Sequence, residues 1–359
     1  MRHLRRATLV SRVSDRLDLL YLAAAGQNLP SVRFRVLPFV AEAQARGLRA
    51  EWRTVPKTAA GRAGFALTLP RARAIVLQKR LLTAPELAML RRRADLVAFD
   101  FDDALWTCHP NVTDQAQRDR VASRAAGGLE RTAARVDLVV AGNAYLAGRM
   151  KALARRVEIL PTPIDARIYL PPARRAESGR ITVGWMGTSC NLFFLPEVFE
   201  ALRRISDLVR VFVVSDEPCV FPHGLPATFM SWSPAAEVEH LQAMDVGLMP
   251  LTDDEYTRGK CGFKLLQYMA CGTVPVASDV GFNREIVRHG VNGFLVRGAA
   301  ETVDCVERLA RDPALRRDMA EAARRTVEEK FSLEAAADKL FAWLGLGGRS
   351  AGFRGGRAG

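Results

Sequence analysis

Strand-like and helix-like segments alternate along this chain in two successive runs, and this alternation restricts the fold more than any other feature. The apolar run at 74–80 lacks the period-two polarity of a half-exposed strand and is typical of a parallel strand covered on both faces. Strands that alternate with helices in this way predict parallel βαβ units with right-handed crossovers. We therefore expect an α/β fold.

The stretch PPARRAESGR at 171–180 interrupts the alternation, because it is charged, begins with two prolines and has no hydrophobic period. With 359 residues, the chain has room for two domains of roughly 150 to 200 residues each. We expect two Rossmann-like, doubly wound domains that face a central cleft. Their predicted bounds are 1–170 for the N-terminal domain, 171–180 for the linker, 181–346 for the C-terminal domain and 347–359 for a disordered Gly/Arg tail without apolar anchors.

The segment from Asp253 to Val296 contains the clearest candidate site, where a polar loop runs into an amphipathic helix. A helix N-terminus presents unpaired N–H groups and binds anions, phosphate above all. Gly259 and Gly262 would let a ligand approach the backbone, and Lys260 and Lys264 lie on one side of the first turns. The 52 basic residues comprise only 7 Lys beside 45 Arg, so two lysines here favour a phosphate site. A solvated basic helix end is the alternative.

Residues 259–296, GKCGFKLLQYMACGTVPVASDVGFNREIVRHGVNGFLV, resemble the donor-binding segment of the retaining GT-B glycosyltransferases of group 1. The stretches SVRFRV, VVAGNAYLA, ILPTPID and ITVGWMGT are similar to landmarks of the same family. The resemblance implies a GT-B fold with an acceptor domain first and a nucleotide-sugar donor domain second. It also implies two carboxylates, eight positions apart, that contact sugar and ribose hydroxyls. Gly259 and Gln267 stand at those positions, and only Gln267 can still hydrogen-bond to a hydroxyl.

The resemblance assigns a further donor contact to Glu285, and Asn283 is a candidate in the same segment. Gly187 and Thr188 are donor-binding candidates because their loop follows a strand, where open α/β sheets bind ligands. The loop after ITVGWMG lacks the basic residue that the family often carries there, so the diphosphate would depend on the two lysines and on Arg33. Arg33 and Arg35, in a predicted loop at 26–35, are our candidates for acceptor or phosphate contacts. The alternatives are packing for Gly187, helix capping for Thr188 and a first-turn helix position for Glu285.

Acidic residues gather at the end of another predicted strand, at Asp100, Asp102 and Asp103. Three close carboxylates repel one another, so at least one pKa should rise unless a cation offsets the charge. We interpret Asp102 and Asp103 as catalytic or hydroxyl-binding carboxylates of the acceptor site, with His109 able to orient a hydroxyl. Turn capping for the aspartates and a structural role for the histidine are the alternatives. A D-x-D metal site is also conceivable, but the resemblance is to a metal-independent family, so no metal is expected.

The net charge of +13 predicts attraction to anions, although a compositional bias toward Arg is an equal alternative. The six cysteines form no C-x-x-C pair, which argues against zinc or a redox motif and fits a reducing cytosol. No apolar run reaches the ~18 residues of a membrane span, and Asp15 and Asp18 interrupt a stretch that otherwise resembles a signal peptide. We expect a cytoplasmic protein with peripheral, electrostatic contact to the inner membrane face.

These observations lead to the hypothesis of a retaining, metal-independent glycosyltransferase with a nucleoside-diphosphate sugar as co-substrate and no other cofactor. The acceptor would be a glycan, a lipid-linked sugar or a polysaccharide precursor. Lys260, Lys264 and nearby amides would stabilise the leaving diphosphate. The alternative is a non-catalytic GT-B scaffold or a basic, anion-binding protein, which the missing carboxylates would favour. Nucleic acid is not expected, because the basic residues have no aromatic interleaving.

Overall fold

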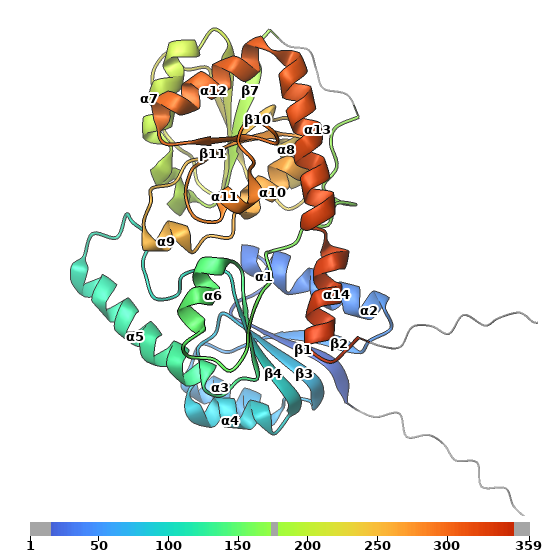
Figure 1. Cartoon of the computed structure of the whole chain (residues 1–359). Coiled ribbons are helices and arrows are strands. Elements are labelled where there is room, and N and C mark those ends of the chain that lie inside the picture. Colours follow the sequence, from blue (N-terminus) through green and yellow to red (C-terminus); the bar gives the residue numbers. More distant parts are fainter. Residues whose placement is uncertain (1–15, 174–178, 348–359) are drawn as a thin grey trace, which may run out of the picture.

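The computed structural model describes residues 16–173 and 179–347, which form two domains, each built on one six-stranded sheet (Figure 1). All strand pairs in both sheets are parallel. The N-terminal sheet has the order β2-β1-β3-β4-β5-β6, with bounds Leu17–Ala23, Ala50–Thr54, Ala72–Gln78, Ala94–Phe101, Leu138–Ala141 and Val157–Ile159 for β1 to β6. The C-terminal sheet has the order β12-β11-β10-β7-β8-β9, with bounds Ile181–Met186, Val209–Ser215, Ala227–Ser231, Val246–Met249, Val274–Ser278 and Phe294–Val296 for β7 to β12.

Both strand orders are doubly wound, so the predicted α/β architecture is confirmed. In each sheet the chain first builds outward on one side and then restarts on the other side of its first strand. This reversal lies between β1 and β3 in one sheet and between β7 and β10 in the other. Open α/β sheets bind ligands beyond the carboxyl ends of the strands at such a switch point. The fold therefore prepares one candidate binding edge in each domain.

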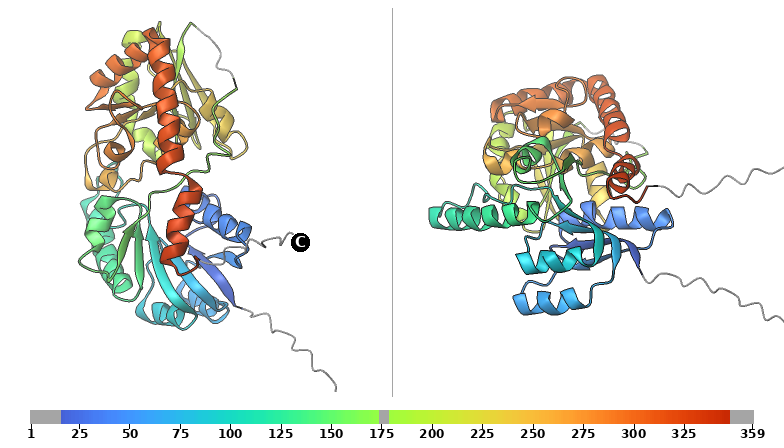
Figure 2. Two further views of the ribbon diagram at one scale, coloured as in Figure 1. Left: turned by 45° about the vertical axis from the view of Figure 1, so that its right-hand side comes forward. Right: turned by 60° about the horizontal axis from the view of Figure 1, so that its bottom comes forward.

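Helices cover both faces of the N-terminal sheet (Figure 1). Their bounds are Pro30–Arg35 (α1), Leu37–Ala45 (α2), Ala59–Leu67 (α3), Ala84–Arg91 (α4), Gln115–Ala133 (α5) and Ala144–Met150 (α6). The expected loop at 26–35 is thus partly helical, because Pro30 sits at the first helical position, where its fixed φ and missing N–H favour a helix start. Helix α5 projects beyond the body of the domain in Figure 1 and in the right-hand view of Figure 2.

The C-terminal domain places its helices on both faces of the second sheet in the same way. Their bounds are Ser189–Phe194 (η1), Pro196–Leu202 (α7), Arg203–Ile205 (η2), Glu237–Gln242 (α8), Glu255–Arg258 (α9), Phe263–Ala270 (α10), Asn283–Ile286 (α11), Ala299–Arg311 (α12) and Pro313–Lys330 (α13), and a last helix, α14, follows at Leu333–Trp343. Here η1 and η2 are short 3₁₀ helices of six and three residues. The segment after β7 is therefore a 3₁₀ helix followed by an α-helix that begins at Pro196.

The last helix returns to the first domain (Figure 1). Leu340 and Phe341 of α14 belong to the same buried cluster as Tyr21 and Phe39, and Arg46 of the N-terminal domain hydrogen-bonds to Asp338. Residues 333–346 therefore pack on the N-terminal sheet and not within the second domain, where the sequence prediction placed them. Most of the predicted tail and half of the predicted linker lie outside the described residues.

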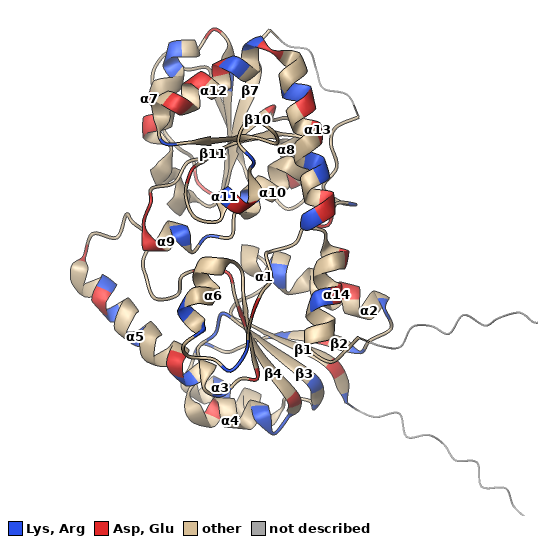
Figure 3. Cartoon of the chain, in the orientation of Figure 1, with Lys and Arg blue, Asp and Glu red and all other residues tan. Residues whose placement is uncertain are grey.

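Figure 3 shows that basic and acidic residues are interspersed along the elements of both domains. Many of them form surface ion pairs, such as Arg311 with Glu307 and Arg203 with Glu200. Among the described residues, no helix has both the length and the apolar character needed to cross a bilayer.

Candidate active site

A cleft of about 530 Å³ lies between the two domains, where the switch points of both sheets meet. The N-terminal domain contributes Asn28 and Leu29 after β1 and Lys79 after β3. The C-terminal domain contributes Gly187 and Thr188 after β7, together with the start of α10. Residues far apart in sequence thus face one cavity, as the predicted two-domain cleft requires.

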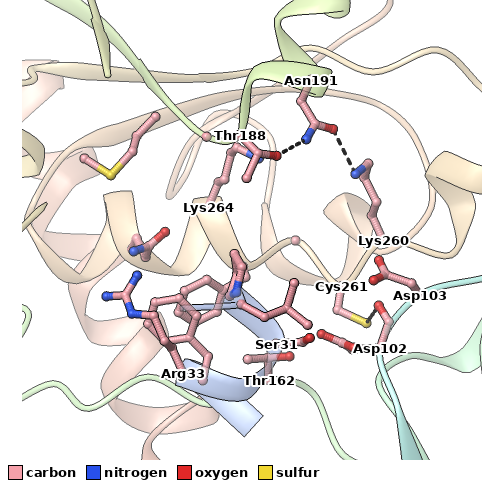
Figure 4. Close-up of a pocket in the computed structure, with 18 of the residues that line it drawn as sticks. Ser31, Arg33, Asp102, Asp103, Thr162, Thr188, Asn191, Lys260, Cys261 and Lys264 are labelled. Carbon is pink, nitrogen blue, oxygen red and sulfur yellow. Dashed lines mark hydrogen bonds between the residues drawn. The ribbon is translucent and has the colours of Figure 1, made fainter. Parts of the chain in front are cut away.

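Gly262 begins α10 in a left-handed conformation, with φ of 62°. A side chain there would be strained, and its Cβ would lie 2.4 Å from Ile286 Cδ1. The turn carries Lys260 and Lys264 on either side of Gly262 into the cleft (Figure 4). A Cβ on Gly187 would lie 2.5 Å from Lys264 Cε, so the absence of a side chain at 187 makes room for this lysine.

Lys264 lies over the indole ring of Trp185, with Nζ 5.4 Å from the ring centroid. Burial, with a further contribution from nearby Lys260, lowers the pKa of Lys264 to about 7. The Lys260 ammonium donates to Asn191 Oδ1 at 3.1 Å and lies 4.6 Å from the centroid of the Tyr256 ring. Burial also lowers the pKa of Lys260, because the nearby acidic groups do not fully offset the loss of water.

Neither lysine has an ion pair with a carboxylate within the described ranges, 16–173 and 179–347. Asn191 Nδ2 in turn donates to Thr188 Oγ1 at 2.9 Å, so the amide is held between Thr188 and Lys260 (Figure 4). Two partly desolvated amino groups that have no carboxylate ion partner in the described part of the chain can together bind a multiply charged anion. The two lysines that the sequence singled out therefore lie together in the cleft.

Opposite the lysines, Asp102 and Asp103 line the N-terminal side of the cleft. Lys79 forms ion pairs with both, at 3.0 Å to Asp102 Oδ1 and closer still to Asp103 Oδ2. Burial alone would raise the pKa of the Asp102 carboxyl, but Lys79 and Arg35 outweigh burial and hold that pKa below its usual range. Lys79 has a φ of 57°, the one left-handed non-glycine residue in the described part of the chain. Such backbone strain is typical of functional sites.

The carboxylate expected to have a raised pKa is Asp100, which lies in the core and not in the cleft. Burial raises its pKa, against the opposing effect of Arg35. Arg35 is fully buried, donates to both oxygens of Asp100 and also donates to Leu160 O at 2.8 Å. The prediction that Arg35 contacts an acceptor or a phosphate is therefore wrong, since its guanidinium is used inside the N-terminal domain.

Arg33 lines the cleft, but its charge is already paired. It forms a two-pronged ion pair with Glu237, at 2.9 and 3.1 Å, and lies over the ring of Trp232. The Glu237 carboxylate also accepts hydrogen bonds from Trp232 Nε1 at 2.8 Å, from Gln267 Nε2 at 3.2 Å and from the Tyr169 hydroxyl. This network joins α1 of the first domain to α8 and α10 of the second.

Gly259 does not line the cleft, although the resemblance places a donor-binding carboxylate at this position. A Cβ on Gly259 would lie 2.6 Å from Ala104 Cβ and 2.8 Å from Ala104 N, in the loop after β4. Asn143 Nδ2 donates to the Gly259 carbonyl at 3.3 Å and to the Lys260 carbonyl at 3.0 Å. Gly259 is therefore a point of close approach between the domains, and its backbone leaves no space for a glutamate.

Three other predicted contacts also lie away from the cleft lining. Asn283 is buried and donates to the carbonyl of Ser278 at 3.0 Å, while Glu285 is exposed on α11. The His109 ring packs against Phe194 and Tyr256, with centroids 5.3 and 5.0 Å away. Burial lowers the pKa of His109, so its neutral, structural form is favoured. The predicted residues that do line the cleft are Lys260, Lys264, Asp102, Asp103, Gly187, Thr188, Gly262, Gln267 and Arg33.

Sequence reasoning missed Lys79, Asn191, Tyr256 and Glu237, all of which line the cleft. Lys79 had a usable signal, because it directly follows a buried parallel strand and so lies at the ligand-binding edge. Glu237 had none, since it lies 30 positions from Gln267 in an otherwise ordinary amphipathic helix.

Comparison with known proteins finds a family model that matches much of the second domain. Residues 181–312 match the family model described as Glycosyl transferases group 1. The chain is 28% identical over 248 residues to a D-inositol 3-phosphate glycosyltransferase of Geodermatophilus obscurus, an alignment that covers 60% of this chain and 54% of that protein. This chain thus spans about half the length of that relative.

Two solved structures have the same fold as the whole chain. HepE from Anabaena, in complex with UDP, superimposes with a TM-score of 0.66 at 16% identity, over 92% of this chain and all of that one. Sucrose-phosphate synthase from Thermosynechococcus elongatus gives a TM-score of 0.70 at 16% identity, over 91% of this chain and 98% of that one. At such low identity these similarities establish the fold alone. The chain therefore has the GT-B fold, and residues 181–312 of its C-terminal domain match the family model of the group 1 glycosyltransferases.

Proposed function

We propose that this protein is a glycosyltransferase that moves a sugar from a nucleoside-diphosphate donor to an acceptor held by the N-terminal domain. The observation that carries the proposal is the pair Lys260 and Lys264, partly desolvated and without carboxylate ion pairs in the described part of the chain, at the start of α10. The UDP in the complex of the structurally similar HepE supports a nucleotide as the ligand.

The two ammonium groups would act on the departing diphosphate. Negative charge grows on the bridging oxygen as the bond to the sugar breaks, and preorganised cations stabilise that charge most when they need not rearrange. Thr188 and Asn191 hold Lys260 in position. The Gln267 side chain would form a hydrogen bond with a hydroxyl group of the nucleotide sugar, and closure of the domains would exclude water from the cleft.

On the acceptor side, Asp102 and Asp103 would bind hydroxyl groups, since Lys79 forms ion pairs with both and holds both side chains at the cleft. A phosphorylated, lipid-linked or polysaccharide-precursor glycan is the acceptor class that we favour. The relative from Geodermatophilus, named for D-inositol 3-phosphate, and the sucrose-phosphate synthase support a phosphorylated partner. The net charge of +13 supports a cytoplasmic protein that attaches peripherally to the anionic inner face of a membrane.

The transfer is proposed to retain the anomeric configuration and to need no metal or other cofactor, as the family resemblance implies. Addition of EDTA should then leave the rate unchanged, and the anomeric signals of the product in NMR should match those of the donor. A loss of activity with EDTA that Mg²⁺ restores would overturn the metal-independent form of the proposal.

The decisive assay is a panel of UDP-, GDP- and ADP-sugars, with hydrolysis and transfer measured for wild type and for Lys260→Ala/Lys264→Ala. We expect turnover of at least one donor by wild type and its loss in the double variant. Lys151→Ala is the matched control, because Lys151 is exposed at the end of α6, outside the cleft. Absence of both turnover and nucleotide binding in wild type would leave a non-catalytic GT-B scaffold.

A further inference from the structure

Glu237 is a buried carboxylate in the first turn of α8, and its side chain is only 4% exposed. Its two oxygens receive hydrogen bonds from four side chains, Arg33, Tyr169, Trp232 and Gln267. Arg33 supplies the counter-charge, so the carboxylate is neutralised as well as fully hydrogen-bonded. Such a saturated group has no capacity left for a ligand, and its effect on the cleft must act through its neighbours.

The neighbour that reaches furthest into the cleft chemistry is Gln267. An ionised carboxylate only accepts hydrogen bonds, so it fixes which end of the Gln267 amide faces it. The amide nitrogen Nε2 donates to Glu237 Oε1 at 3.2 Å, and the carbonyl oxygen Oε1 is left as the arm for a ligand. Gln267 lines the cleft on α10, three positions after Lys264, and so lies next to the proposed diphosphate site.

We propose that Glu237 is a positioning residue, which orients the Gln267 amide so that the amide oxygen accepts a hydrogen bond from a hydroxyl group of the nucleotide sugar. The proposal rests on the proposed function, because the hydroxyl belongs to one of the two sugars that flank the diphosphate. An acceptor oxygen suits a hydroxyl and repels phosphate, so Gln267 selects the sugars while the lysines select the diphosphate. The pair of residues thereby presents to the cleft the oxygen that a carboxylate at 267 would present.

The same geometry explains why a glutamate does not fit at 267 in this chain. Its carboxylate would lie against that of Glu237, at a position where the present contact is 3.2 Å. Two ionised carboxylates at that distance repel strongly in a buried setting. Exchange of the two residues, with the amide at 237 and the carboxylate at 267, would restore one donor and one acceptor across the contact.

The test uses four variants of the full chain, Glu237→Gln, Gln267→Glu, the exchanged pair Glu237→Gln/Gln267→Glu, and Glu239→Gln. Glu239 is exposed on the same helix and serves as the matched control. Affinities are measured by calorimetry for UDP, GDP and ADP, and for the 2′,3′-dideoxy form of the one that binds best. Affinities of the nucleotide sugar and the free nucleoside diphosphate are compared in the same way, so that the ribose and the transferred sugar are distinguished. Melting temperatures are recorded in parallel.

We expect each single variant at 237 or 267 to weaken nucleotide or nucleotide-sugar binding by about tenfold. The exchanged pair should bind more tightly than the product of the two single effects predicts. Wild type should discriminate against loss of the hydroxyls of one sugar, and Glu237→Gln should lose that discrimination. Changes in melting temperature alone, with both discrimination ratios as in wild type, would overturn the positioning role. If wild type binds none of the nucleotides, the proposed function fails and this inference fails with it. That outcome is distinguishable from failure of the positioning role alone, in which wild type still binds a nucleotide.

Discussion

The pH dependence of nucleotide binding should report directly on Lys264. Burial, and then the charge of Lys260, lower its pKa to about 7, so the ammonium that a diphosphate requires is only partly formed at neutral pH. Apparent affinity scales with the fraction of protein in the binding-competent form. With a pKa near 7, that fraction falls from roughly three-quarters at pH 6.5 to roughly one-tenth at pH 8. We therefore expect the affinity for a nucleoside diphosphate to fall by roughly tenfold over this interval.

The assay is isothermal titration calorimetry at constant ionic strength, in buffers of different ionisation enthalpy. Binding should draw the pKa of Lys264 upward, so wild type should take up as much as about half a proton at pH 7. Lys264→Arg stays protonated throughout and should show a flat profile without proton uptake. Lys264→Ala should be flat as well, at lower affinity. A flat wild-type profile, or the same slope in Lys264→Ala, would refute the assignment.

The Lys264→Ala variant also separates the effect of Lys264 on catalysis from its effect on stability. Loss of one preorganised charge typically lowers kcat by about 10²–10³, or roughly 3–4 kcal/mol. Stability should not fall. The folded pKa is depressed, so the unfolded chain binds more protons between about pH 7 and pH 10, and wild-type stability should rise with pH across that window. Lys264→Ala should remove this rise and match or exceed the wild-type melting temperature at pH 7. A collapse of the melting temperature would reassign Lys264 to structure.

Three further predictions concern the acceptor side of the cleft, the buried ion pair of the N-terminal domain and the net charge of the chain. Lys79→Met leaves Asp102 and Asp103 without their shared cation, so acceptor-dependent turnover should drop by about tenfold or more while nucleotide affinity barely changes. An equal loss of nucleotide affinity would place these two aspartates on the donor side of the cleft. Asp100→Asn leaves Arg35 buried without a counter-charge and should lower the unfolding free energy by about 3–5 kcal/mol in urea titrations, whereas a change under about 1 kcal/mol would show that the pair is dispensable. The protein should bind anionic vesicles at low salt and leave them as the Debye length shrinks to about 8 Å, and binding that is absent at low salt or insensitive to salt would exclude electrostatic attachment.

The parts of the site that could be predicted from the sequence are those set by local geometry. Lys260, Gly262 and Lys264 lie within five residues around one helix start, so their spacing alone placed them on one edge. The alternation of strands and helices likewise predicted both sheets.

Arg33 and Arg35 show where such reasoning stops. Two positions along a helix turn a side chain by about 200°, so one guanidinium faces the cleft and the other enters the core. No sequence signal separated them, because the segment was expected to be a loop. Glu237 and α14 were missed for a related reason. A pattern of apolar residues predicts that a helix has a buried face, but not which domain covers it, nor which distant carboxylate meets Gln267.

A crystal structure of the protein with the nucleoside diphosphate that binds best tests the central claim most directly. We predict that the diphosphate lies in the interdomain cleft, with its oxygens within hydrogen-bond distance of Lys260 Nζ and Lys264 Nζ, and with Asn191 still in contact with Lys260. A nucleotide bound elsewhere on the chain, or one in the cleft with both lysines turned away from the phosphates, would contradict the account.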